Sequence, residues 1–232
     1  MFPIVPGGND RLPAPQAWTR DEKSEKFTRP DIDRTGLRGI LAQFPNLDLV
    51  FHHIIPFYRL RDVWNALVHH SHATQLAQAT VALRHYLLLC NPSLPLIEQR
   101  LNCIRTGALD VAQCNELATL AVWPPWNIVE GPHTRLRTDD PGDYLIDRYT
   151  HGLTVQEQTR MRAIETLDAQ FETFVATIGN RRETALRAIA EALRAARQSL
   201  ACATPIYIRA RMWDEDHGRW SKRRTGERII QR

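Results

Sequence analysis

Two adjacent histidines, His52 and His53, stand at the end of an apolar run in residues 48–60, which read DLVFHHIIPFYRL. Successive side chains of a strand point to opposite faces, so the two imidazoles could face a metal ion and a substrate respectively. That division suits hydrolysis of a phosphodiester. A divalent ion polarises the phosphate, while a neutral imidazole, with an ordinary pKa of about 6.5, takes a proton from the attacking water. The alternative is a strand that carries two structural histidines.

The segment FHHIIP, residues 51–56, resembles the first strand of the ββα-metal nucleases, also called HNH or His-Me finger enzymes. In that family a metal ligand and the general base stand side by side, followed by an apolar residue and a proline. The resemblance implies that His52 is the ligand and His53 the base. Asn127, in PPWNIVEGP, matches the central asparagine of the family. That residue binds the metal in some members and holds the loop of the base in shape in others.

The separation between His53 and Asn127 is 74 residues, whereas the family usually has a few tens. An insertion of helices between the two strands would explain the difference, because connecting segments tolerate insertions. The closing histidine of the family has no clear match, although His133 is a candidate ligand. Asp139 and Asp140 could supply carboxylates instead, which suit Mg²⁺ or Mn²⁺. The expected cofactor is a divalent metal, Mg²⁺ first, with Mn²⁺, Zn²⁺ or Ni²⁺ as alternatives.

Several other charged residues have two interpretations each. Arg135 and Arg137 could clamp a phosphate through paired hydrogen bonds, or could pair with the two aspartates and fix the loop. Glu130 could be a further ligand or an ion-pair partner. Arg59 and Arg61 could contact a nucleic-acid backbone, or could form only the solvent face of a helix start.

The histidines of VHHSHA and the four cysteines are interpreted as structural. His69, His70 and His72 have a spacing that could suit a metal, but no carboxylate is near them in the sequence, so a polar helix face is favoured. The cysteines form no C-x-x-C pair, and most lie in segments with a helical period. They are therefore expected to be small buried apolar residues.

The net charge of +4 comes entirely from the C-terminal end of the chain. Residues 205–232 hold eight Lys or Arg against four acids, and the rest of the chain holds 22 of each sign. Such a patch attracts phosphate backbones, although a solvated tail is an equal alternative. The residues assigned to nucleic-acid binding here are Arg219, Lys222, Arg223 and Arg224.

The pattern of elements predicts a mainly α protein with a small β element (α+β). A strand over 46–55 ends at Pro56, and helical periods follow from 59 to 89 and on to 122, where WPPWN interrupts them. A capping box, Thr154 with Glu157, opens a helical hairpin. Its expected apolar stripes are Met161, Ile164, Leu167, Phe171, Phe174 and Ile178, then Leu186, Ile189, Leu193 and Leu200.

Four regions are predicted. Residues 1–46 form an irregular N-terminal arm, and residues 47–152 form a ββα-metal-like core with a helical insertion at about 59–122. Residues 153–203 form the helical hairpin. Residues 204–232 form a basic C-terminal β-hairpin or tail, in which DEDHG is the turn.

The expected function is a metal-dependent endonuclease that hydrolyses nucleic acid, with DNA favoured over RNA. The combination HHIIP, WNIVEGP and R-x-DDPG is similar to HNH-like toxin domains of bacterial competition systems, which implies an antibacterial effector and a cognate immunity protein as partner. The chain lacks the pattern of a secretory signal and any apolar run of about 20 residues, so it is expected to be made in the bacterial cytoplasm and delivered by a secretion system. The alternative is a non-catalytic helical module that binds nucleic acid or docks on a protein. Another hydrolase or transferase is ranked last, since no phosphate loop, G-x-S-x-G or H-E-x-x-H motif is present.

Overall fold

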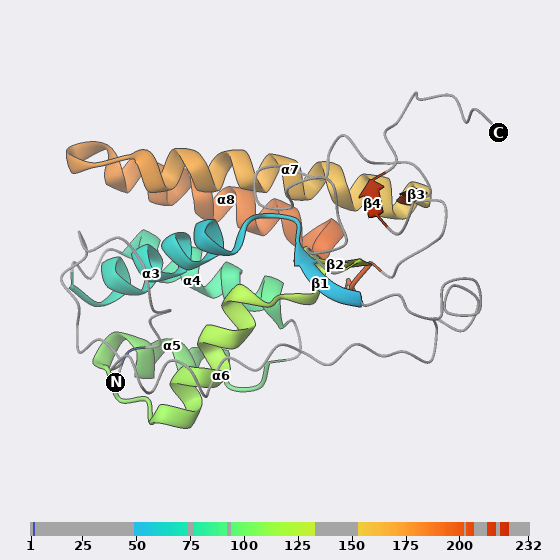
Figure 1. The fold of residues 1–232 in the computed structure, drawn as a ribbon. Helices are drawn as coiled ribbons and strands as arrows, with labels where there is room; N and C mark the ends of the chain where they lie inside the picture. The colour runs from blue at the N-terminus through green and yellow to red at the C-terminus, as the bar shows by residue number, and fades with distance from the viewer. Residues whose placement is uncertain are drawn as a thin grey trace.

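The computed structural model describes Phe2 and residues 49–73, 77–91, 94–132, 153–201, 203–206, 213–216 and 219–222. Within these ranges the chain is mainly helical (Figure 1). The elements in order are β1 (Leu49–His53), α3 (Phe57–Ala73), α4 (Ala77–Cys90), α5 (Ile97–Thr106), α6 (Val111–Val122), the 3-10 turn η2 (Pro125–Asn127), β2 (Ile128–Pro132), α7 (Val155–Ala176), the 3-10 turn η5 (Gly179–Arg181), α8 (Arg182–Leu200), β3 (Trp213–Asp216) and β4 (Arg219–Lys222).

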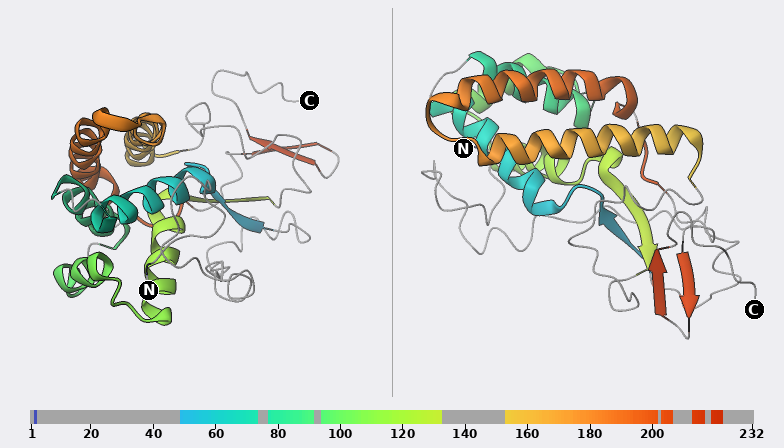
Figure 2. Two further views of the ribbon diagram at one scale, coloured as in Figure 1. Left: turned by 90° about the vertical axis from the view of Figure 1, so that its left-hand side faces the viewer. Right: turned by 90° about the horizontal axis from the view of Figure 1, so that it is seen from above.

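The helices are stacked in three layers. The α7–α8 hairpin covers one side of α3 and α4, and α5 with α6 covers the other (Figures 1 and 2). The strands β1 and β2 extend from one end of these layers, next to the start of α7. We call these three stacked layers, α3 to α8, the helical platform. The predicted catalytic strand, β1, lies at one end of it.

The core of the platform follows the helical period of the sequence. Trp64 of α3, Tyr86 of α4 and Phe171 of α7 are fully buried, and their rings contact one another in series across the layers. The predicted stripes of α7 and α8 are buried with one exception. Ile178 is 76% exposed, because α7 ends at Ala176 and the chain turns there.

Local signals in the sequence mark the starts of two helices. Thr154 and Glu157 form the predicted reciprocal capping box at the start of α7. A second capping box, between Asp110 and Gln113, opens α6. The single helical period over 59–89 corresponds to two helices, α3 and α4.

The strand pair joins segments far apart in the sequence. β1 and β2 are antiparallel, with His52 opposite Val129 and His53 opposite Ile128, and helices α3 to α6 lie between them in the chain. An isolated parallel bridge between Val129 and Ile206 adds one residue of the C-terminal segment to the edge of β2.

The C-terminal hairpin is confirmed, with different bounds. β3 and β4 pair antiparallel, Trp213 opposite Lys222 and Asp216 opposite Arg219. DEDHG is therefore not the turn alone, since its three acids belong to β3.

The prediction of a mainly α fold with a small β element is confirmed. A ββα-metal core stays a prediction, because residues 133–152, which would follow β2, lie outside the described residues. The arm over 1–46 lies there too, apart from Phe2.

Cys90 and Cys114 are buried free thiols whose pKa values are raised by burial, and Cys103 is a half-buried free thiol. In the described part of the chain, no helix is both long and apolar enough to cross a membrane.

Candidate active site at the end of strand β1

His53 is half-buried and is held by two aromatic contacts and a hydrogen bond. Its ring lies 4.1 Å from the ring of Trp123, centroid to centroid, and meets Phe57 edge-on at 5.8 Å. Its Nε2 lies 2.6 Å from the carbonyl oxygen of Val122. Because a carbonyl only accepts, Nε2 carries the proton, and the lone pair of the neutral ring is on Nδ1.

The sequence WPPWN explains why the end of helix α6 needs side-chain donors. The last carbonyls of a helix lack partners within the helix. Pro124 and Pro125 have no N–H group to supply one to the preceding turn. The hydroxyl of Tyr86 donates to Ala121 O at 2.8 Å, and His53 donates to Val122 O. The histidine of the strand therefore also caps the helix that precedes β2.

Asn127 fixes the turn that follows His53. It is fully buried, and its side-chain amide pairs with both backbone groups of Ile55: Oδ1 accepts from Ile55 N at 2.7 Å and Nδ2 donates to Ile55 O at 2.9 Å. The backbone adds a bond from Ile54 N to Asn127 O at 2.8 Å. The amide extends the β1–β2 ladder by one residue where the main chain turns into η2.

This geometry bears on the two roles that the resemblance left open for Asn127. Its side-chain oxygen already accepts a buried hydrogen bond from Ile55, as expected of a residue that holds the loop of the base. The role of metal ligand stays a prediction for this residue.

Arg160 of α7 donates hydrogen bonds to backbone carbonyls of η2. It is not among the site residues predicted from the sequence. It is 6% exposed, and its guanidinium donates to Trp126 O through Nε at 3.0 Å and Nη2 at 2.5 Å, to Pro125 O at 2.9 Å, and to Thr204 O. Burial lowers its pKa to about 10, an effect that Glu157 partly offsets, so it stays charged at neutral pH. The available signal was its position four residues before Ile164, on the inward stripe of the helix.

His52, the predicted metal ligand, is 6% exposed and precedes His53 in β1. A neutral imidazole is a metal ligand of the right kind, but one ligand does not make a site. No group of three His, Cys, Asp or Glu able to hold a metal occurs within the ranges that the structure describes.

The remaining predicted ligands and phosphate contacts are only partly placed. His133, Arg135, Arg137, Asp139, Asp140, Arg223 and Arg224 lie outside the described residues. For Glu130, Arg219 and Lys222 the structure gives the backbone alone: the first lies in β2, the others at the two ends of β4. Their roles stay predictions.

Arg59 and Arg61 lie at the start of α3, directly after the histidine strand, and both face carboxylates. Arg59 is 3.4 Å from Asp168 and 3.0 Å from Glu172, and its side chain is 16% exposed. Arg61 pairs with its neighbour Asp62 at 2.9 Å. Burial raises the pKa of Asp168, although Arg59 opposes that effect. The structure gives Arg59 a role between α3 and α7, while a nucleic-acid contact stays a prediction.

The histidines of VHHSHA lie near the C-terminal end of α3, and their side chains are half-buried. Burial lowers the pKa of His70 to about 4, with further effects from Arg182 and His69. His72 Nδ1 lies 2.5 Å from Arg105 O, and its ring contacts the ring of Phe2. The structural interpretation of these residues therefore has contacts that support it.

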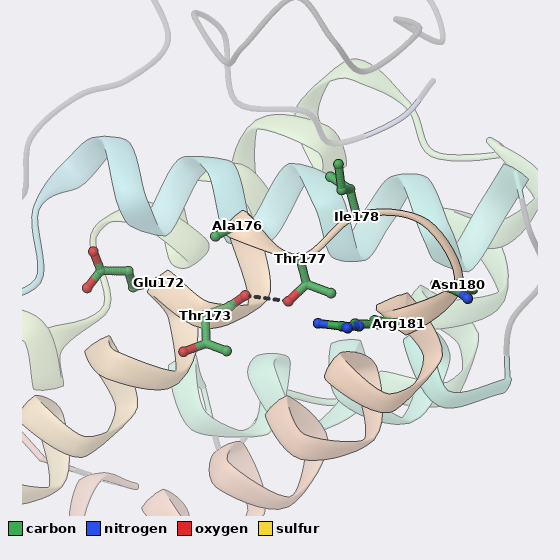
Figure 3. Close-up of a pocket in the computed structure, with 7 residues that line it drawn as sticks. All are labelled: Glu172, Thr173, Ala176, Thr177, Ile178, Asn180 and Arg181. Carbon is green, nitrogen blue, oxygen red and sulfur yellow. Dashed lines mark hydrogen bonds between the residues drawn. The ribbon is translucent and has the colours of Figure 1, made fainter.

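One open hollow lies between the end of α7 and the start of α8 (Figure 3). Its wall includes Glu172, Thr173, Thr177 and Arg181, and Thr177 Oγ1 donates to Thr173 O at 2.7 Å. The hollow is at the opposite end of the α7–α8 hairpin from β1 and β2 (Figure 1). With one carboxylate and no histidine in its lining, it offers no chemistry to the histidine strand.

Comparison with protein-family models, with curated proteins and with solved structures gives no match for this chain, so its function must be argued from the residues around His53 and Asn127.

Proposed function

We propose that the chain is a metal-dependent endonuclease of the HNH kind, with His53 as the general base. The observation that carries the proposal is the tie between the two segments that the resemblance selects. HHIIP and WNIVEGP are 74 residues apart, yet they pair as β1 and β2, and Asn127 bonds to the backbone two residues after His53.

The hydrogen bond from His53 to Val122 O suits a general base. A base works best when its ring is fixed and its tautomer is defined by a partner on the other nitrogen. With Nε2 donating to Val122 O, the Nδ1 atom of the neutral ring is the proton acceptor. In the proposed reaction Nδ1 takes a proton from the water that attacks the phosphorus.

The metal would be held by His52 with carboxylates or His133 from outside the described residues. A divalent ion, when bound, supplies polarisation of the phosphate and stabilisation of the leaving oxygen. Arg135 or Arg137 would bind the charge of the transition state, and the basic residues of the C-terminal hairpin would hold the nucleic acid. An antibacterial effector neutralised by an immunity protein is the biological setting that we propose for such an enzyme.

The test is cleavage of supercoiled plasmid DNA by the purified chain with Mg²⁺, Mn²⁺, Zn²⁺, Ni²⁺ or EDTA. His53→Gln is the informative variant, because a glutamine amide can still donate to a carbonyl but cannot act as a base near neutral pH. The matched control is His72→Gln, since His72 also donates to a backbone carbonyl, that of Arg105. A parallel assay on single-stranded RNA separates the two nucleic acids.

Metal-dependent nicking that His53→Gln abolishes and His72→Gln retains would support the proposal. A rate loss of about 10²-fold or more is expected for removal of a general base. If the folded wild-type chain cleaves neither DNA nor RNA with any of the metals, the proposal is wrong. The non-catalytic binding or docking module would then be the better account of the histidine strand.

A further inference from the structure

We infer that Arg160 couples the basic C-terminal segment to the catalytic turn, so that docking of that segment and correct placement of the His53 loop depend on one buried guanidinium. Arg160 is a positioning residue in this scheme, because its contacts are with backbone carbonyls and not with a reacting group. The mechanistic part of the inference rests on the proposed function. The structural coupling can be tested without it.

The guanidinium contacts two segments that are distant in the sequence. On one side it donates to Pro125 O and Trp126 O, in the turn that carries Asn127. On the other side it donates to Thr204 O, at the start of the segment that leads to β3 and β4. The two groups of acceptors, at Pro125–Trp126 and at Thr204, are far apart in the chain but bond to one side chain.

Each segment is in turn bonded to the strand pair. The Asn127 amide holds both backbone groups of Ile55, two residues after His53. Ile206 N donates to Ile128 O at 2.9 Å, and Ile206 forms the bridge to Val129. Loss of the guanidinium therefore removes the donor to the carbonyl of the buried Trp126 and, at the same time, a donor to the carbonyls of the exposed Pro125 and Thr204.

Only arginine fits this set of acceptors. A guanidinium presents five donors in a fixed planar fork, whereas a lysine ammonium presents three donors from one point. Among the described residues the acceptors of Arg160 are neutral carbonyls, and the charge of Glu157 only partly offsets the effect of burial. We attribute its presence to orientation of the two segments, a role documented for some buried polar groups.

The first measurement is hydrogen exchange of individual amides in Arg160→Met and Arg160→Lys. The reporters are Ile55 N–H, which donates to Asn127, and Ile206 N–H, which donates to Ile128. Leu193, in the core of α8, reports on global unfolding. Arg162→Met is the matched control, since Arg162 lies on the same helix with an exposed side chain.

In Arg160→Met, both reporters are expected to exchange faster than in the wild type by about tenfold or more, and by more than Leu193 does. In Arg160→Lys, both reporters should exchange faster than in the wild type but slower than in Arg160→Met. In Arg162→Met, their exchange rates should match those of the wild type. Acceleration at only one reporter, or equal acceleration at all three amides, would overturn the coupling.

The second measurement is the single-turnover nicking rate of the same variants at saturating metal and DNA. Loss of a supporting residue around a catalytic group typically lowers activity by about 10–100-fold, and Arg160→Met should fall in that range while Arg162→Met does not. An unchanged nicking rate in Arg160→Met would contradict the link to catalysis. If the wild type does not nick at all, the proposed function fails while the exchange result still decides the coupling.

Discussion

Replacement of Asn127 by aspartate tests the paired hydrogen bonds that hold the loop after His53. The two side chains have the same shape, so no cavity forms. In Asn127→Asp one oxygen can still accept from Ile55 N, but the other faces Ile55 O, to which the native Nδ2 donates at 2.9 Å. A carboxylate cannot donate there, whereas a protonated carboxyl can. The cost of the substitution should therefore depend on pH.

The magnitude follows from the burial of the site, which is complete. A carboxyl in such a place has a pKa raised by about 3 units from an unfolded value of about 3.9. Because the folded pKa is the higher one, the folded state binds more protons, and stability is lost as pH rises from about 3.9 to about 7. At 1.36 kcal/mol per unit, the variant should be less stable than the wild type by about 1.5 kcal/mol at pH 5 and about 4 kcal/mol at pH 8.

The assay is urea unfolding followed by tryptophan fluorescence, for both proteins at each pH. Asn102→Asp, at an exposed position of α5, is the control and should show no such trend. A cost for Asn127→Asp below about 0.5 kcal/mol that does not change with pH would refute the hydrogen-bond argument. Selective stabilisation of the variant by Mg²⁺ would instead favour Asn127 as a metal ligand.

Three further predictions concern the helical platform. The pKa of His70 falls from an unfolded value of 6.5 to about 4, so the wild-type protein should lose stability as the pH drops from 6.5 towards 4. The expected loss is about 1.5 kcal/mol after allowance for solvent screening. Urea unfolding of His70→Gln should show a smaller loss over the same pH range. Gly107→Ala should lower the free energy of unfolding by about 1–2 kcal/mol or more, because φ of Gly107 is +67° and the new Cβ would lie 2.6 Å from the Phe2 ring. If adding Phe2→Ala to this variant recovers no stability, the clash with the Phe2 ring does not contribute. Arg59→Met leaves the buried Asp168 carboxylate without its arginine and should lower the free energy of unfolding by about 3 kcal/mol in the same assay. If adding Asp168→Asn restores part of that stability, the ion pair is confirmed. If it restores none, the result counts against the ion pair.

The helices were predictable because their signals are local. The period of Leu186, Ile189 and Leu193 and the capping box at Thr154 act within one or two turns, and both are confirmed. Ile178 was placed in the core wrongly, because the period alone does not say where the helix ends. The chain leaves α7 at Ala176, before that residue can face inward.

The site was predictable only in part, because its parts meet through long-range contacts. The resemblance selected His53 and Asn127, and an insertion between two strands was expected from their spacing. The partner of the His53 ring, Val122 O, belongs to the backbone and has no sequence signal of its own. Arg160 was missed because an arginine on a helix is usually solvated, and its acceptors, which include the carbonyls of Trp126 and Thr204, become visible only in the folded chain.

The distance in sequence between β1 and its partners has a consequence for the order of folding. Helices α3 to α6 can form from local contacts while β1 waits for β2, and closure of so long a loop is slow compared with helix formation. Ile206, the last of the described residues that bond to β2, is synthesised about 8–30 s after His53 at ordinary rates of translation. The nascent chain should therefore acquire its helical layers first and its proposed chemistry last, which gives a binding partner time to engage it before it can act.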